Sequence, residues 1–257
     1  MRLLALRVVA ALFALTWLVF PGFGLIDLSV TWDPDWPVVL EAGWGVFMTV
    51  LVGGSFLAIA VRPHRPAPQL ITLGVALTTM LVAAGAGREP LLLVYVAVLL
   101  VEGAVALALL PQRQPVRSTG FAPSWPLLAL AAAGAVPWLI NAVAMFEADR
   151  QGAGVLIGDV TNGVDHYSVQ GALALALVIL PLLAATWARG RRYLGLSAAL
   201  CATYLGVVSY AFPDTAAGLG PVWSPLCLSW GLAVGLTATH RFPHRRRALV
   251  RGERAPQ

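Results

Sequence analysis

The stretch YSVQGALALALVILPLLAATWARGRR, residues 167–192, combines the two features that decide the fold. Residues 167–188 carry no charged side chain, and a helix needs about 20 such predominantly apolar residues to cross a bilayer. Arginines follow at positions 189, 191 and 192, and short arginine-rich loops face the cytoplasm. The stretch therefore predicts a transmembrane helix that runs from the outer surface to the cytoplasmic surface.

Seven further apolar runs of this kind divide the rest of the chain. The composition agrees, because 59% of the residues are hydrophobic, 11% are charged and the mean hydropathy is +0.80, whereas a soluble domain carries about 25% charged residues. We therefore expect an all-α polytopic membrane protein, with a single bundle of eight transmembrane helices in residues 1–240. The seven further runs are 8–26, 42–61, 70–87, 91–110, 125–146, 193–212 and 221–239.

Arginine supplies all 17 basic residues, and its distribution orients the bundle. When the loops are assigned alternately to the two sides, 15 arginines share the side of the termini, and the other side holds Arg88 and Arg150. Positive charge marks the cytoplasmic side, so we expect both termini in the cytoplasm and the chain in the plasma membrane. We expect the basic tail, residues 241–257, to be disordered and to lie on anionic lipid headgroups.

Two alternatives to this interpretation have less support in the sequence. The basic start and the first apolar run also suit a secretory signal peptide, but no small-x-small cleavage site follows the run closely. The pI of about 9.9 could indicate nucleic-acid binding, but the arginines lie in short loops and in the tail, so no nucleic-acid partner is expected. The absence of lysine from the sequence also excludes chemistry that needs a Schiff base.

The two halves of the chain resemble each other at an offset of 129 residues. With this offset Glu41 aligns with Gln170, and each lies near the start of an apolar run that ends in an arginine-rich loop. Four helices per half would make the two repeats parallel, as they are in some transporters. The alignment predicts a 4+4 parallel repeat.

Glu102 is the sharpest candidate for function, because it lies near the middle of the fourth apolar run with no other charge within ten residues. A carboxylate at this depth costs at least ~2.5 kcal/mol and suggests a functional site by default. The functional interpretation is a proton or cation relay. The structural one is a neutral carboxyl group bonded to Asn141, Tyr95 or a freed backbone carbonyl. We expect Glu102 to line a transport path together with Glu41, Asn141 and Gln170.

The loop before residue 167 gathers polar side chains: Asp159, Asn162, Asp165 and His166. Asn162-Gly163 is a turn dipeptide and Asp165 is a natural N-cap, which leaves His166 to face the outer interface. Such carboxylate, amide and imidazole groups could also hold a divalent cation. Their spacing matches no calcium-loop pattern, and a single histidine is too few for a typical zinc or copper site, so neither a metal nor a cofactor is expected.

The sequence contains no HExxH, GxSxG or P-loop motif, so no catalytic residue is assigned and an enzymatic function is not favoured. We expect a transporter or permease for a small solute or ion. One alternative is an integral membrane enzyme of lipid or envelope metabolism that uses Asp165 and His166. The other is a non-catalytic accessory membrane protein.

Overall fold

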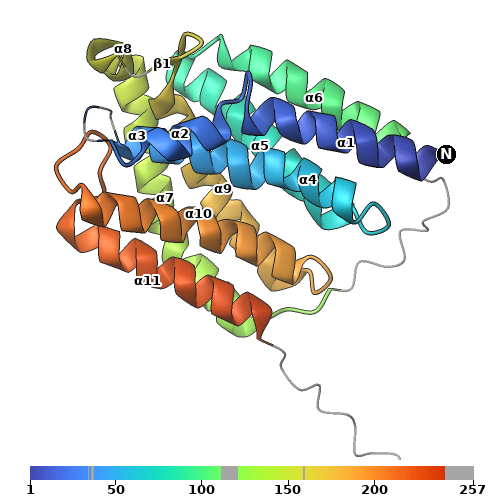
Figure 1. Cartoon of the computed structure of the whole chain (residues 1–257). Coiled ribbons are helices and arrows are strands. Elements are labelled where there is room, and N and C mark those ends of the chain that lie inside the picture. The colour runs from blue at the N-terminus through green and yellow to red at the C-terminus, as the bar shows by residue number, and fades with distance from the viewer. Residues whose placement is uncertain (34, 36–37, 111–120, 159, 241–257) are drawn as a thin grey trace, which may run out of the picture.

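The computed structural model describes residues 1–240 apart from 34, 36–37, 111–120 and 159. The predicted tail, residues 241–257, and Asp159 therefore lie outside the described residues. Helices make up most of the chain (Figure 1), and two segments, η1 and η2, have the wider π-helical form. The elements in order are α1 (Arg2–Leu18), α2 (Gly24–Val30), α3 (Val38–Val46), η1 (Phe47–Gly53), α4 (Gly54–Val61), α5 (Ala67–Ala83), η2 (Ala84–Arg88), α6 (Leu92–Ala108), α7 (Trp125–Arg150), α8 (Ala153–Ile157), β1 (Val160–Thr161), β2 (Val164–Asp165), α9 (His166–Thr186), α10 (Arg191–Ala211) and α11 (Gly220–Thr239).

Six helices in the described part of the chain are long and apolar enough to cross a membrane, which supports a multi-pass membrane protein. Two of them are composite: Val38–Val61 joins α3, η1 and α4, and Ala67–Arg88 joins α5 and η2. The other four are α7, α9, α10 and α11. Six of the eight predicted runs thus form helices of sufficient length, and the prediction of eight spans is not confirmed. The first and fourth runs form α1 and α6, which are shorter, with 17 residues each.

The first apolar run does not form the continuous helix predicted for residues 8–26. The helix α1 ends at Leu18, and the short helix α2 continues in the same direction after a break in the helix (Figure 1). Pro21 lies in this break and has no N–H to offer to a helical hydrogen bond. Phe23 then adopts a left-handed backbone conformation, with φ of 55°. A break at residues 19–23 therefore divides the predicted helix into α1 and α2.

The helix α9 lies at the centre of the bundle, where it packs against α3, α5, α7 and α10. Figure 1 shows α10 and α11 on one side of it and α1, α4 and α6 on the other. The composite helix that contains α3 and η1 supplies the large, fully buried side chains Trp44, Phe47 and Met48. The contact between α3 and α9 is thus deep inside the protein.

Both ends of the described chain lie at the same end of the bundle (Figure 1). The start of α1 and the end of α11 are there, together with the α4–α5 and α9–α10 turns. These two turns carry Arg62, Arg65 and Arg189. Arg88 and Arg150 end the helices that point to the opposite end. The arrangement of the helices therefore agrees with the alternation of charge in the sequence.

Candidate functional site

The site is built around the break between α1 and α2. A helix break inside a bilayer exposes carbonyl groups that water cannot solvate, so side chains must bond them. The Trp44 indole N–H donates to the Gly22 carbonyl at 2.8 Å. The Pro21 carbonyl accepts from the Asn162 amide at 3.3 Å and from the Tyr95 hydroxyl at 3.5 Å. Side chains from three other segments thus form hydrogen bonds with the carbonyl groups that the break exposes.

Asn162 reaches the break from the tip of a short hairpin. The strands β1 and β2 pair antiparallel, with Thr161 opposite Val164, and Asn162 and Gly163 form the turn with φ of 52° and 82°. Positive φ at both positions is the geometry that an Asn-Gly turn favours, so the predicted turn is confirmed. The Asn162 amide also donates to the Tyr95 hydroxyl at 2.9 Å.

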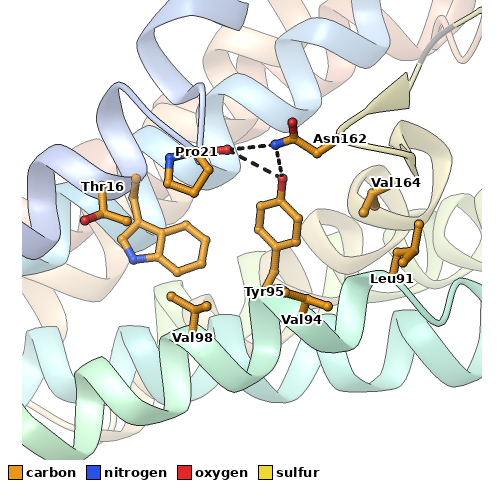
Figure 2. Close-up of a pocket in the computed structure, with 10 residues that line it drawn as sticks. Thr16, Pro21, Leu91, Val94, Tyr95, Val98, Asn162 and Val164 are labelled. Atoms are coloured by element: carbon orange, nitrogen blue, oxygen red, sulfur yellow. Dashed lines mark hydrogen bonds between the residues drawn. The ribbon is translucent and has the colours of Figure 1, made fainter.

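A cavity of about 190 Å³ lies beside this turn. Figure 2 shows Asn162 and Tyr95 directed toward the Pro21 carbonyl on its wall. Most of the lining is apolar and comes from α1, α6 and β2, including Trp17, Val94, Val98 and Val164. Tyr95 and Asn162 therefore place polar atoms in a largely apolar cavity.

Glu102 is buried, with 6% of its surface exposed, and its carboxylate accepts a hydrogen bond from the Trp17 indole N–H. The two residues are 85 positions apart in the sequence, on α6 and α1. The partners proposed from the sequence were Asn141, Tyr95 or a freed carbonyl, and Trp17 was not among them. The side chain of Glu102 therefore points into the protein rather than toward lipid.

His166 is the first residue of α9 and is 1% exposed. The expectation that it faces the outer interface is wrong, because the start of α9 packs against α3. Its ring stacks on Trp44, with centroids 4.7 Å apart and an interplanar angle of 29°. Its Nε2 atom lies 2.7 Å from the Thr161 hydroxyl, and its Nδ1 atom lies 3.9 Å from the Glu41 carboxylate. His166 and Glu41 form a buried pair.

Gln170 lies one helical turn after His166 and is also 1% exposed. Neither its amide oxygen nor its amide nitrogen has a hydrogen-bond partner among the described residues. The amide lies over the backbone of Gly43 on α3, in the space that a Cβ atom there would occupy. An amide buried without a partner costs about 1–3 kcal/mol. This is the feature of the site that packing explains least.

Aromatic rings connect the Glu41–His166 pair with Glu102. The rings of Trp44 and Tyr95 are 5.5 Å apart and meet edge to face, and those of Tyr95 and Trp17 are 6.0 Å apart. Trp44 contacts His166, and Trp17 bonds Glu102. Three of the four residues predicted for a path are thus adjacent or connected through these rings. Asn141 is not, because it lies in a separate groove between α7 and α11.

Asp165 is the N-cap of α9, as predicted. One carboxylate oxygen accepts from the Tyr167 N–H at 2.9 Å, and the other accepts from the Gly154 N–H at 3.0 Å. Its own N–H donates to the Glu89 carboxylate at 3.3 Å. These bonds tie the start of α9 to the segments around α8 and α6.

Another buried carboxylate, that of Asp149, was not predicted from the sequence. The hydroxyl of Ser168 donates to the carboxylate of Asp149, which is 9% exposed. Both side chains lie against Gly87, where a Cβ atom would overlap them. The fifth run was predicted to end at residue 146, but α7 continues to Arg150, which places Asp149 inside the helix. Asp149 would have been recognised only if the helix had been predicted to extend to residue 150.

Among the described residues, no group of three or more His, Cys, Asp or Glu side chains is placed to hold a metal ion. Asp159, which was considered as a ligand, lies outside those residues. Comparison of the chain with protein-family models, curated proteins and solved structures gives no match. Any function must therefore be argued from the residues themselves.

Proposed function

We propose that the protein is a permease for a small solute or ion, and that a proton or small cation moves between the outer end of the bundle and Glu102. The observation that carries this proposal is the buried Glu102 carboxylate, which is connected through aromatic rings to the Glu41–His166 pair. A proton relay needs titratable groups at both ends. Glu41 and His166 are at one end of this connection, and Glu102 is at the other.

The energetics favour a functional over a purely structural carboxylate. Placing Glu102 at membrane depth costs at least ~2.5 kcal/mol. One hydrogen bond to a charged group returns about 1.5–3 kcal/mol, and one to a neutral group returns less. The Trp17 bond therefore offsets the cost at best. A leucine at this position would pack without that cost, so stability alone does not account for the carboxylate.

The surroundings also provide room for water and for movement. The cavity of about 190 Å³ beside Trp17 and Tyr95 exceeds the roughly 10–15 Å³ that one water molecule needs. The π-helical segment η1 begins three residues after Trp44, and such segments occur frequently at functional sites. In this proposal, water in the cavity and local repacking of η1 carry the proton past the aromatic rings.

The bounds of the elements support the predicted 4+4 repeat. Adding 129 to the bounds of α2 gives 153–159, which overlaps α8, and adding it to those of α6 gives 221–237, which lies within α11. The packing shows the same correspondence. With this offset α3 falls on α9 and α5 falls on α10, and α5 contacts α9 as α10 contacts α3 and η1. In this repeat Glu41 and Gln170 occupy matching positions at the contact between the halves.

We also infer the orientation from the charges. The arginine-rich turns and both ends of the described chain share one end of the bundle, which we assign to the cytoplasm of a plasma-membrane protein. The Glu41–His166 pair then lies on the outer side. An enzyme acting on lipids at the outer surface is less well supported, because His166 is buried and both oxygens of the Asp165 carboxylate accept backbone hydrogen bonds.

The test is proton flux into vesicles that contain the purified full-length protein and a pH-sensitive dye. We expect the Glu102→Gln variant to lose the flux while its melting temperature stays close to that of the wild type. The matched control is Glu147→Gln, because Glu147 is an exposed carboxylate that pairs with Arg150. Normal flux in Glu102→Gln overturns the proposal and leaves the accessory function as the better interpretation.

A further inference from the structure

The hairpin β1–β2 carries a side chain that reaches the buried His166 from the surface. Asn162 and Gly163 at its tip are exposed, and Thr161 is partly exposed, whereas His166 is 1% exposed. The Thr161 hydroxyl lies 2.7 Å from Nε2 of His166, which is a hydrogen-bond distance. One side chain therefore connects the exposed hairpin with the imidazole of the proposed path.

The imidazole ring of His166 has two other neighbours, and both are buried. One face of the ring stacks on Trp44, with centroids 4.7 Å apart, and Nδ1 faces the Glu41 carboxylate at 3.9 Å. Trp44 is 0% exposed and Glu41 is 5% exposed. Of these three neighbours, Thr161 alone is partly exposed, so Nε2 is the ring nitrogen that faces the surface side of the protein.

Contacts along the hairpin hold Thr161 in this place. The next residue, Asn162, donates to the Pro21 carbonyl at 3.3 Å and to the Tyr95 hydroxyl at 2.9 Å. Val164, which pairs with Thr161 across the hairpin, is fully buried. An isolated two-stranded hairpin is marginally stable at best. These tertiary contacts therefore decide where the hydroxyl lies.

A hydroxyl group in this place can pass a proton inward. It has one O–H donor and two acceptor lone pairs, so it can accept a proton from water while it donates its own proton to Nε2. A hydronium ion then becomes water, the Thr161 hydroxyl is regenerated, and His166 becomes an imidazolium ion. The Glu41 carboxylate, 3.9 Å from Nδ1, balances this positive charge.

A metal cation cannot use the same contact. It must exchange its water shell for protein ligands, and Ca²⁺ and Mg²⁺ each take about six or more of them. The contact offers one hydroxyl and one imidazole nitrogen. In the part of the chain that the structure describes, no three His, Cys, Asp or Glu side chains are grouped to hold a metal ion. The chemistry of this contact therefore selects a proton.

We propose that the Thr161 hydroxyl is the outer port of the path, and that the ion which enters through it is a proton and not a metal cation. This inference rests on the proposed function, in which Glu41, His166 and Glu102 form a relay. It adds the residue through which the relay meets water, and it names the class of ion. Thr161 carries the proton to Nε2 and positions the imidazole.

The experiment measures ion flux into vesicles that contain the purified full-length protein and either a pH-sensitive or a Na⁺-sensitive dye. Thr161→Val keeps a β-branched side chain that suits a strand, but it removes the hydroxyl group. We expect its proton flux to fall by about 100-fold, since a positioned proton-transfer group contributes about 10²–10⁴-fold. Thr161→Ser keeps the hydroxyl group and should restore the flux. Both variants should melt within a few degrees of the wild type.

The matched control is Thr215→Val. Thr215 is also partly exposed, but its hydroxyl donates to the Phe212 carbonyl at 2.9 Å and contacts no titratable group. It lies between α10 and α11, and the turn between these helices is at the same end of the bundle as the hairpin (Figure 1). We expect this variant to conduct protons like the wild type. The Na⁺-sensitive dye should report no uptake by any of these proteins.

Three results overturn the inference: normal proton flux in Thr161→Val, equal losses in Thr161→Val and Thr161→Ser, or Na⁺ uptake by the wild type. Equal losses would mean that the methyl group of Thr161, and not its hydroxyl, is what the site needs. The Glu102→Gln variant separates this inference from the proposed function. If Glu102→Gln loses the flux and Thr161→Val keeps it, the relay stands and the port is wrong. If Glu102→Gln keeps the flux, the proposed function itself is wrong.

Discussion

Trp44 and His166 stack at 4.7 Å across the contact between α3 and α9. The same indole donates its N–H to the Gly22 carbonyl at the break between α1 and α2. One side chain therefore joins the break, the buried histidine and, through Tyr95, the connection to Glu102. We therefore expect a substitution of either Trp44 or His166 to alter the side-chain contacts at the other end of the site.

Substitution of His166 by phenylalanine separates packing from chemistry. The phenyl ring keeps the stack on Trp44 but removes the contacts with the Thr161 hydroxyl and the Glu41 carboxylate. We expect the melting temperature in detergent to change by only a few degrees and the proton flux to be lost. His166→Ala should lose both the flux and about 1–3 kcal/mol of unfolding free energy. Full flux in His166→Phe would show that the imidazole acts only as a packing group.

The bond between Trp17 and Glu102 should appear as strong coupling in a double-mutant cycle. Trp17→Phe removes the donor and leaves a buried carboxyl group unsatisfied, which should lower the unfolding free energy by about 1–3 kcal/mol. Replacing Glu102 by leucine in the same protein removes the acceptor as well, so much of that loss should be recovered. Thermal unfolding of the four proteins measures the coupling. Additive effects of the two substitutions would contradict the bond.

Gly43 should tolerate alanine poorly, because the Gln170 amide occupies the space of a Cβ atom at this position. We expect Gly43→Ala to lower the unfolding free energy by about 1–3 kcal/mol, since the amide must move within a packed core. The matched control is Gly74→Ala on α5, where a Cβ atom would meet nothing within 4 Å. That variant should be neutral or more stable by up to about 1 kcal/mol. Similar melting temperatures for the two variants would argue against the close contact.

The parts of the fold that depend on local sequence were predicted well. The span at α9 follows from an uncharged apolar run, and its start follows from the capping side chain of Asp165. The turn at Asn162-Gly163 likewise needs only its own two residues. Apolar length and local chemistry decide these features, so no knowledge of the tertiary structure is required.

The parts that depend on distant contacts were not predicted. Trp17 and Glu102 meet across 85 residues, and nothing near either residue signals the other. Hydropathy alone does not separate α1 from α2, because the turn between them is itself apolar and its carbonyls are bonded by side chains from elsewhere. Asn141 was assigned to the path for its polarity, but the direction in which a helix faces depends on its neighbours.

The orientation of the bundle can be tested by labelling one introduced cysteine at a time. His64 in the α4–α5 turn and Gln151 after α7 are both exposed and lie at opposite ends of the bundle. The native residues Cys201 and Cys227 are buried, at 0% and 8% exposure, so their background should be low. With the arginine-rich end in the cytoplasm, a membrane-impermeant maleimide should label Gln151→Cys in intact cells and should label His64→Cys only after lysis. The reverse pattern would place the Glu41–His166 pair on the cytoplasmic side, and the proposed movement of protons between the outer end of the bundle and Glu102 would then be wrong.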